Sequence, residues 1–350
     1  MATADDQVTA VILAAGRGTR MRSALPKVLH PVCGTPIVRR VQKSLKAAGI
    51  SKQILVLGDI SKSFEQLIND DRFASVVQQT NRLGTGDAVA ACYPAFTEVE
   101  KPSFAAGRLI AGSPLSSSFV LITAADTPAL SSTVLETFVQ KCLEQSAKLA
   151  VIGMNQPNPF GYGRLITEKQ KLLAIVEEKD ASDQERKITL CNSGVVFADT
   201  KYLFELLAQI DNSNKQGEYY LTDCFKLAAD KNEGAFVFVT DDFESFAGVN
   251  NREQLSIIED HLQKKLKQKW MKEGVSFRLS ETTYIDDAVE LARDVTVYAG
   301  CYLTGTCKIP EGSIIDANVR LHNVEFSKAV HIPAGTVLSD TKDHKSCVEL

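Results

Sequence analysis

Over the first 250 residues, hydrophobic positions form short runs that alternate with longer amphipathic stretches. A short continuous hydrophobic run is typical of a strand buried on both faces, whereas hydrophobic positions three or four residues apart are typical of a helix. The runs that predict strands are Val8–Leu13, Gln53–Leu57, Ser75–Val77, Phe119–Thr123, Leu149–Gly153 and Phe236–Val239. Such alternation predicts an α/β fold with helices on both faces of a sheet.

Two stretches between these runs, Pro36–Ala48 and Thr133–Gln145, have helical spacing. Gly49 is suited to end the first helix, and Ser131 or Ser132 can cap the second. In α/β sheets, ligands bind beyond the carboxyl ends of the strands. The loop that follows Val8–Leu13 is therefore the first place to look for a binding site.

Residues 97–118 break this alternation, because they are rich in Pro, Ala, Gly and Ser and show little periodicity. A segment of this length without regular structure is uncommon inside a compact domain. We expect a mobile surface insertion rather than a lid over the functional site, and the sequence does not indicate its role.

Beyond residue 250 the hydrophobic period changes twice. Residues 251–272 predict one amphipathic helix that links two domains, with Leu255, Ile258, Leu262 and Leu266 on one stripe. A period of six follows, in Val297, Leu303, Ile309, Ile315 and Leu321, with a second set two places earlier at Val295, Cys301, Cys307, Ser313 and Val319.

Six residues is the repeat of a β-helix built from hexapeptides, and ordinary strands are the alternative. The repeat fades after Phe326, so we expect a short solenoid. The predicted division is a domain at 1–250, a linker helix at 251–272 and a truncated β-helix at 273–350.

Composition narrows the class of protein. The net charge of −4 over 350 residues argues against broad binding to nucleic acid. No hydrophobic run approaches the ~20 residues of a membrane helix, and the first ten residues lack the features of an export signal. Eight cysteines occur without a C-x-x-C pair, which favours buried thiols over disulfides or a zinc site. We expect a cytoplasmic protein that does not bind membranes.

The loop after the first strand carries most of the candidate chemistry. Residues 13–31 read LAAGRGTRMRSALPKVLHP, in which Gly16 and Gly18 allow backbone N–H groups to approach an anion. Arg17, Arg20, Arg22 and Lys27 add positive charge. The G-x-x-x-x-G-K-[ST] phosphate loop is absent, and G-x-G-x-x-G fails at Met21. The loop nevertheless favours a nucleoside triphosphate.

Several ordered motifs extend this pattern over nearly the whole chain: LAAGRGTRM, LPKVLHPVCGTPI, QTNRLGTGDAV, FGYGRLI, IVEEKDAS, CNSGVVF, QGEYYLTD and GVNNREQL. Together they resemble the sugar nucleotidyltransferases, and within them the bacterial N-acetylglucosamine-1-phosphate uridylyltransferases, which are usually bifunctional. The resemblance implies a Rossmann-like nucleotidyltransferase domain with a mixed sheet, followed by a left-handed β-helix.

The same resemblance implies that UTP and N-acetylglucosamine 1-phosphate are joined to UDP-N-acetylglucosamine with release of pyrophosphate. Arg20 and Lys27 would contact and polarise the triphosphate, while Ala14, Gly16 and Gly18 would offer backbone contacts. Positioning and charge neutralisation suffice for such a transfer. From the residues alone, the glycines would also suit a plain strand-to-helix turn and the basic residues a solvated face.

Further site residues are implied by the resemblance. Asp126 and Asn250 would bind Mg²⁺, and Asp126 directly follows a predicted strand. Gln79, Gly84 and Thr85 would recognise uracil, and Gly163, Glu177 and Asn192 would bind the sugar. Without the resemblance, Asp126 would suit a turn, Gly84 a helix cap, and Glu177 an exposed charge cluster.

The sequence departs from the family pattern in two places. Relatives usually have Gly where Ala125 stands, and an added methyl group next to the metal and the sugar could weaken the fit of the substrate. The β-helix is expected to stop after about two and a half coils, before any acetyltransferase site, so we expect no acetyltransferase activity. Relatives trimerise through this element; it could still support a homo-oligomer, although the short contact argues against a trimer.

Two alternatives to the uridylyltransferase stay open. The first is the same chemistry on another sugar 1-phosphate or nucleotide. The second is a non-catalytic sensor of nucleotide sugars, against which the intact Arg20, Lys27, Asp126 and Asn250 argue.

Overall fold

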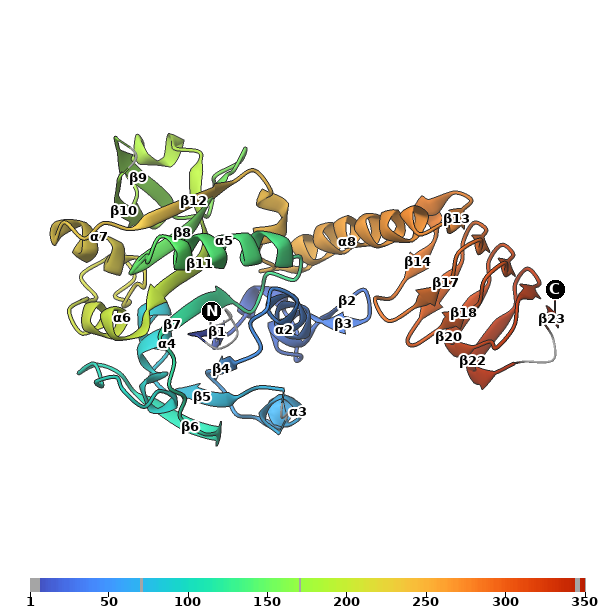
Figure 1. Ribbon diagram of the computed structural model, residues 1–350, viewed down its shortest axis with the longest axis horizontal. Helices are drawn as coiled ribbons and strands as arrows, with labels where there is room; N and C mark the ends of the chain where they lie inside the picture. The colour runs from blue at the N-terminus through green and yellow to red at the C-terminus, as the bar shows by residue number, and fades with distance from the viewer. Residues whose placement is uncertain (1–6, 70–71, 170, 344–346, 350) are drawn as a thin grey trace. The chain divides into compact units, whose positions relative to one another are not determined.

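The computed structural model describes residues 7–69, 72–169, 171–343 and 347–349 (Figure 1). They form two compact units. The first contains the described residues up to Leu29 together with Ile37–Asn250, and the second contains His30–Pro36 together with the described residues from Asn251 onward. The hydrophobic pattern did not indicate that residues 30–36 would leave the first unit.

A mixed sheet runs through the first unit in the order β10-β9-β11-β7-β1-β4-β5-β6, with β8 paired to β11 and β12 to β8. Strands β1, β4, β5 and β7 pair in parallel, whereas β6 and β11 join them antiparallel. The six predicted strands and the mixed sheet are confirmed. The bounds are β1 (Val8–Ala14), β4 (Gln53–Leu57), β5 (Ser75–Gln79), β6 (Gly107–Gly112), β7 (Phe119–Ala124), β8 (Leu149–Asn155), β9 (Arg164–Glu168), β10 (Lys171–Val176), β11 (Leu190–Asp199) and β12 (Phe236–Thr240).

Helices cover both faces of this sheet, as predicted. Helices α2 and α5 pack into one hydrophobic cluster, and α4, α6 and α7 pack into another. Strand β1 supplies Ile12 to the first cluster and Val11 to the second. The Ser131 hydroxyl caps α5 by accepting from the Val134 amide at 3.3 Å, and Gly49 follows α2 with a φ of +76°. The helices are α2 (Ile37–Ala47), α3 (Glu65–Ile68), α4 (Thr85–Ala90), α5 (Ser132–Glu144), α6 (Thr200–Leu207) and α7 (Asp223–Asp230).

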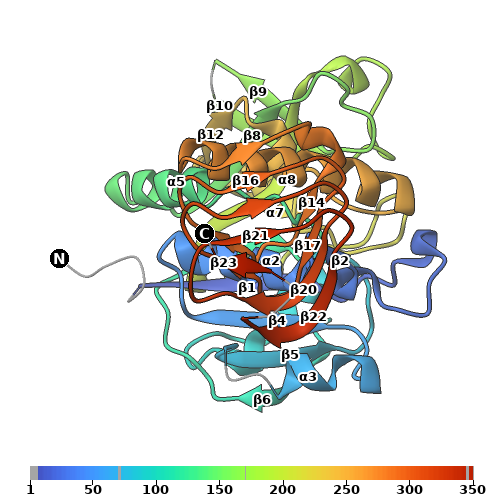
Figure 2. The ribbon, with the colours of Figure 1, turned by 90° about the vertical axis from the view of Figure 1, so that its right-hand side faces the viewer.

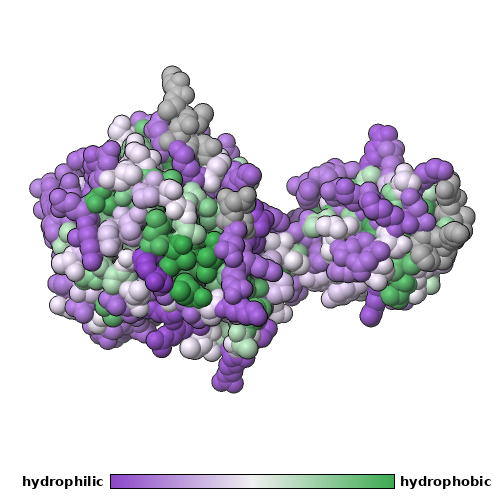
Figure 3. Space-filling model, turned by 90° about the horizontal axis from the view of Figure 1, so that it is seen from below, coloured by the Kyte–Doolittle hydropathy of each residue, from purple (hydrophilic) through white to green (hydrophobic). Residues whose placement is uncertain are grey.

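The expectation of an irregular insertion at residues 97–118 is wrong for Gly107–Gly112, which form the edge strand β6. The loop-like composition has a steric origin, because a Cβ at Gly107 would lie 1.8 Å from the Ala91 carbonyl oxygen. Glycine is therefore needed inside a strand here. Strand β6 lies lowest in Figure 1, and Figure 3 shows hydrophobic residues gathered among hydrophilic ones on the face seen from below.

Besides residues 30–36, the second unit contains α8 (Arg252–Lys272) and a β-helix, which Figure 2 shows along its stacked coils. The Asn251 side chain caps α8 by accepting from the Gln254 amide at 2.8 Å. Leu303 pairs with Leu321 and Val297 with Ile315, so each coil contains three hexapeptides. The predicted inward positions of both sets are all buried. The first strands of the unit are β13 (Ser276–Phe277), β14 (Tyr284–Ile285), β15 (Glu290–Leu291), β16 (Thr296–Val297), β17 (Tyr302–Thr304) and β18 (Lys308–Ile309).

The expected end of the repeat after Phe326 is wrong. Strands β21 (Val330–Ile332) and β22 (Val337–Lys342) extend the β-helix by pairing with β19 (Ile314–Ile315) and β20 (Arg320–Glu325). In the earlier coils, paired residues are 18 positions apart, whereas Leu321 pairs with Leu338. This coil is therefore one residue shorter, and the hydrophobic positions after it no longer follow the period of six. Four parallel strands, β13, β16, β19 and β21, stack in one sheet, which exceeds the expected two and a half coils.

All eight cysteines lie in the described residues, none is in a disulfide, and seven are buried, as predicted. Within the described parts of the chain, no helix combines the length and hydrophobicity needed to cross a membrane.

Candidate active site

Four polar side chains that are far apart in the sequence meet in the first unit. The Lys27 ammonium group donates to Asp126 Oδ2 and, at 3.2 Å, to Asn250 Oδ1. Arg20 donates to the same Asn250 oxygen at 3.0 Å. The Lys27 side chain is 11% exposed and that of Asp126 is 21% exposed. The structure therefore brings together the predicted catalytic residues and the predicted metal ligands.

The sheet explains this convergence. Strands β1 and β7 are parallel neighbours, so the loop that carries Arg20 and Lys27 and the turn that carries Asp126 leave the same edge. The Val249 amide donates to the Asp126 carbonyl at 2.8 Å, which brings Asn250 alongside. Gly18 has a φ of +60°, and a Cβ there would lie 2.7 Å from Lys27 Cβ. Gly18 is thus required by the close approach of the lysine.

A cavity of about 540 Å³, within the size range of small-molecule sites, is lined by Gly16 and Arg17 of the loop that carries Lys27, and by Ala124 at the end of strand β7. A second cavity of about 260 Å³ shares Ala15, Gly16, Arg17 and Arg82 with the first and reaches Ala14 and Gly18. Gly16 has open space on its free side. The predicted backbone contacts at Ala14, Gly16 and Gly18 therefore line the two cavities.

Arg82 is a candidate residue that the sequence analysis missed. Its Nε donates to the Gly58 carbonyl at 3.0 Å, which fixes a half-buried guanidinium group between the two cavities. The available signal was a basic residue soon after strand β5, within the motif QTNRLGTGDAV. Its position makes it suited to contact an anionic ligand.

Gln79, Gly84 and Thr85 line the larger cavity together. Gln79 Nε2 donates to the Gly84 carbonyl at 3.1 Å and to Asp87 Oδ2 at 2.6 Å, so Oε1 is the amide atom that is left to accept from a ligand. Gly84 also caps α4, with a φ of +116°. The helix-cap alternative and a binding role are therefore compatible.

The three predicted sugar-binding residues are neighbours. The Asn192 amide donates to the Gly163 carbonyl at 2.8 Å, and a Cβ on Gly163 would lie 3.4 Å from Glu177 Oε2. Glu177 accepts from the Thr222 hydroxyl at 3.0 Å, and burial raises the pKa of its carboxyl. Glu177 is therefore not a member of an exposed charge cluster. Burial also raises the pKa of Tyr162, and the charges of Cys191 and Asp126 add to this shift.

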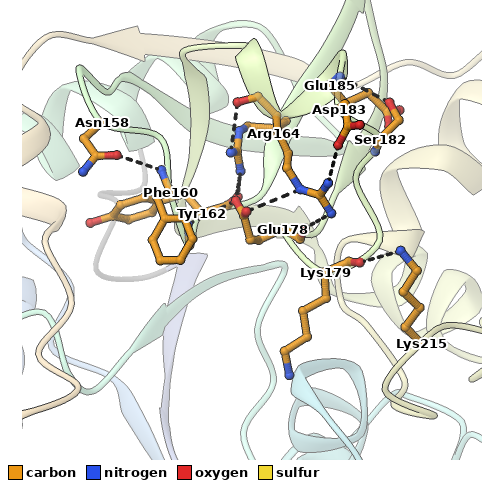
Figure 4. A network of polar contacts seen from close by, with 12 residues as sticks. Asn158, Phe160, Tyr162, Arg164, Glu178, Lys179, Ser182, Asp183, Glu185 and Lys215 are labelled. Atoms are coloured by element: carbon orange, nitrogen blue, oxygen red, sulfur yellow. Dashed lines mark hydrogen bonds and ion pairs between the residues drawn. The ribbon is translucent and has the colours of Figure 1, made fainter.

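A network of ion pairs holds the loop that precedes strand β9 (Figure 4). Arg164, whose side chain is 1% exposed, pairs with Glu178 at 2.7 Å and donates to the Tyr162 carbonyl. Glu178 also accepts from the Gly161 amide at 3.1 Å. The pKa of Glu178 is lowered. Burial alone would raise it, but the hydrogen bonds from Arg164 and Gly161 have the larger combined effect. The backbone on both sides of Tyr162 is therefore fixed.

The departure at Ala125 lies in the hydrophobic core, and its effect on the fit of the substrate stays a prediction. Ala125 is 1% exposed and its side chain belongs to the hydrophobic cluster beneath the sheet. Its amide donates to the Leu13 carbonyl at 2.9 Å, and neither of the two cavities is lined by it. The methyl group packs in the core.

The predicted metal ligands fit Mg²⁺ by their chemistry. Oxygen atoms of Asp126 and Asn250 face one ammonium group, so two hard donors already converge on a positive charge. Across the described residues, no group of three or more His, Cys, Asp and Glu side chains could enclose a metal ion. This donor set suits an ion that keeps the remaining positions for water and phosphate oxygens.

Comparison with known proteins agrees with this geometry. A model of the MobA-like NTP transferase domain matches residues 10–190. The bifunctional protein GlmU of Pelobacter propionicus is 33% identical over 96% of this chain and 70% of its own length. GlmU of Exiguobacterium sibiricum is 34% identical over 95% of this chain and 70% of its length, and that of Clostridioides difficile 31% over 97% and 70%.

Among solved structures, a proposed glucose-1-phosphate thymidylyltransferase from Bacillus anthracis, in complex with a sucrose, has a TM-score of 0.55 at 16% identity. The match covers 72% of this chain and 96% of that one, and it shows a shared fold. The matched domain and the similarity to GlmU over nearly the whole chain give the class of enzyme. The chain belongs to the GlmU-like sugar nucleotidyltransferases and is a sugar-phosphate nucleotidyltransferase.

Proposed function

We propose that this chain transfers a uridylyl group from UTP to N-acetylglucosamine 1-phosphate, forming UDP-N-acetylglucosamine and pyrophosphate. The observation that carries the proposal is the convergence of Arg20, Lys27, Asp126 and Asn250, together with a cavity of nucleotide size that is lined by Gly16 and Arg17 of the same loop. We assign the reaction to the first unit, which contains all four residues.

The transfer needs an in-line displacement at the α-phosphorus. A phosphate oxygen of the sugar phosphate forms the new bond to the α-phosphorus, while the bond from this atom to the bridging oxygen of the leaving pyrophosphate breaks. Lys27 and Arg20 hold the triphosphate and offset the charge that builds on the leaving group, so no covalent enzyme intermediate is needed. When held by Asp126 and Asn250, Mg²⁺ supplies Lewis-acid stabilisation of phosphate charge.

We assign specificity for the two substrates to polar groups of the larger cavity and of the neighbouring sugar-binding residues. Gln79 Oε1 is suited to accept from the N3–H of uracil, beside backbone groups of Gly84 and Thr85. Glu177 and Asn192 are suited to bind the hexose hydroxyl and acetamido groups. A site of this kind rejects analogues that leave its buried polar groups unpaired.

The experiment is a pyrophosphate-release assay with Mg²⁺ and a matrix of nucleoside triphosphates and hexose 1-phosphates. We expect the highest kcat/KM for UTP with N-acetylglucosamine 1-phosphate. If another pair of nucleoside triphosphate and hexose 1-phosphate has the highest kcat/KM, the proposed specificity is wrong. Tight binding of UDP-N-acetylglucosamine without any pyrophosphate release would instead support the sensor.

The expected lack of acetyltransferase activity stays a prediction. Incubation with acetyl-coenzyme A and glucosamine 1-phosphate, followed by detection of free coenzyme A, tests it directly. The cytoplasmic location and the formation of a homo-oligomer through the β-helix also stay predictions.

A further inference from the structure

Residues 97–118 contact the proposed base-binding wall through one aromatic pair. The ring of Phe104 stacks on that of Tyr219, with the centroids 3.9 Å apart and the planes at 7°. Both side chains are half-buried and pack against the same hydrophobic cluster. Tyr219 follows Glu218, which lines the larger cavity.

The backbone of Tyr219 holds both ends of the turn that carries Gly84 and Thr85. Its amide donates to the Leu83 carbonyl at 2.7 Å, and its carbonyl accepts from the Gly86 amide at 2.8 Å. A Cβ on Gly84 would lie 2.5 Å from the Tyr219 carbonyl oxygen, so the turn and this backbone are in direct contact. The position of Tyr219 therefore sets the position of the turn.

The same segment is attached to the wall at a second point. The amide and the hydroxyl of Thr80 donate to the Ala106 carbonyl at 3.0 and 2.6 Å. Gly107 pairs with Gln79 in the β5–β6 ladder. Residues 104–107 thus contact Tyr219 on one side and the Gln79–Thr80 backbone on the other.

We propose that Phe104 is a positioning residue of the nucleotide-base pocket. Through Phe104, residues 97–118 would hold the backbone that selects the base, and we call this role the brace. This inference rests on the proposed function. Phe104 lines neither of the two cavities, so it acts through Tyr219 and does not touch the ligand. Flat stacking fixes the Tyr219 ring and thereby its backbone. Base contacts at Gln79, Gly84 and Thr85 are strongest when their geometry is set before the ligand arrives.

The test compares Phe104→Ala and Phe104→Tyr with the wild-type chain. In Phe104→Ala we expect the KM for UTP to rise about fivefold and the kcat/KM preference for UTP over CTP to fall by a similar factor, as expected for losing one aromatic contact. The kcat at saturating UTP and the KM for the sugar phosphate should change less than twofold, and Phe104→Tyr should behave like the wild type.

Leu115→Ala is the matched control, because Leu115 is a half-buried hydrophobic residue of the same segment whose backbone is hydrogen-bonded to Ala95 and Thr97. It should leave both KM and base preference unchanged. If Phe104→Ala lowers only the melting temperature, or if Leu115→Ala alters base preference equally, the proposal is overturned.

Calorimetric titration with UTP, CTP, ATP and GTP separates this proposal from the proposed function. A wild-type chain that prefers a base other than uracil contradicts the uridylyl assignment, and the brace is then tested on the preferred nucleotide. Equal discrimination in the wild type and Phe104→Ala contradicts the brace alone. A wild type without preference among the four nucleotides contradicts both.

Discussion

The Lys27 ammonium group is held in place by a carboxylate oxygen of Asp126 and an amide oxygen of Asn250. The group is largely buried, and Arg20 shares the Asn250 oxygen. Two cations are thereby fixed at one edge of the sheet before any phosphate arrives. Fixed charges of this kind stabilise a transition state without reorganisation at the moment of reaction.

Lys27→Ala should lower kcat by about a hundredfold or more, because one preorganised cation is removed from the leaving group. Pyrophosphate release at saturating substrates measures this. Lys43→Ala, at an exposed position of α2, is the control and should retain full activity. Circular dichroism should show the same fold for both variants. Unchanged turnover in Lys27→Ala would refute its role.

Arg82→Gln should raise the KM for UTP about tenfold while the affinity for uridine stays the same, because the guanidinium group faces the part of the site shared by the two cavities. Calorimetry with UTP and uridine separates a phosphate contact from a base contact. An equal loss for both ligands would mean that Arg82 only supports the 81–86 turn.

At the scale of elements, the loop before β9 depends on a buried ion pair. Arg164→Met should lower the free energy of unfolding by about 2 kcal/mol, because the partly buried Tyr162 carbonyl loses its donor and Glu178 keeps only its weaker ion pair with Arg186 at 3.6 Å. Urea denaturation measures this. The KM for the sugar phosphate should also rise, since Tyr162 and Gly163 lose an anchor. Lys187→Gln, at an exposed position nearby, should change neither quantity.

Helix α7 begins with an aspartate that is disfavoured in its charged form. Burial, followed by the charge of Asp211, raises the pKa of Asp223 to about 6 from 3.8. Between about pH 4 and pH 6, the Asp223 carboxyl is therefore protonated in the folded state but ionised in the unfolded chain. The free energy of unfolding consequently falls as the pH rises through this range.

Asp223→Asn should remove this decline. Relative to the wild type, the variant should gain about 1–2 kcal/mol of stability between pH 4 and pH 7.5, after allowing for solvent screening of a partly exposed group. Urea denaturation at the two pH values measures the gain. The exposed Asp230→Asn in the same helix is the control. A gain that does not change with pH would exclude titration of Asp223 as the cause.

The elements that the sequence predicted share one physical property. Strands such as β1 and β4 are buried on both faces and so read as continuous hydrophobic runs. Strand β6 was missed because close backbone contact demands glycine, and β21 because one missing residue shifted the repeat. The site residues were predicted by their motifs, whereas Arg82 and Arg164 depend on partners that only the folded chain reveals.

At the scale of the whole molecule, hydrophobic residues are divided between separate cores. Two clusters flank the sheet of the first unit, and a third fills the β-helix and contains Trp270. Trp270 is the single tryptophan of the chain and is buried against that third cluster. Its fluorescence is therefore an intrinsic probe of the second unit, while pyrophosphate release is a probe of the first.

This separation predicts that stability of the β-helix and catalysis respond independently. Ile315→Ala creates a cavity between stacked coils and should destabilise the second unit by about 2–4 kcal/mol, seen as an earlier urea transition of Trp270 fluorescence. In the absence of urea, kcat/KM should stay within twofold of the wild type. Val337→Ala, at a β-helix residue that is 70% exposed, should alter neither property. If kcat/KM falls together with the fluorescence midpoint across several such variants, the β-helix takes part in catalysis and the reaction does not belong to the first unit alone.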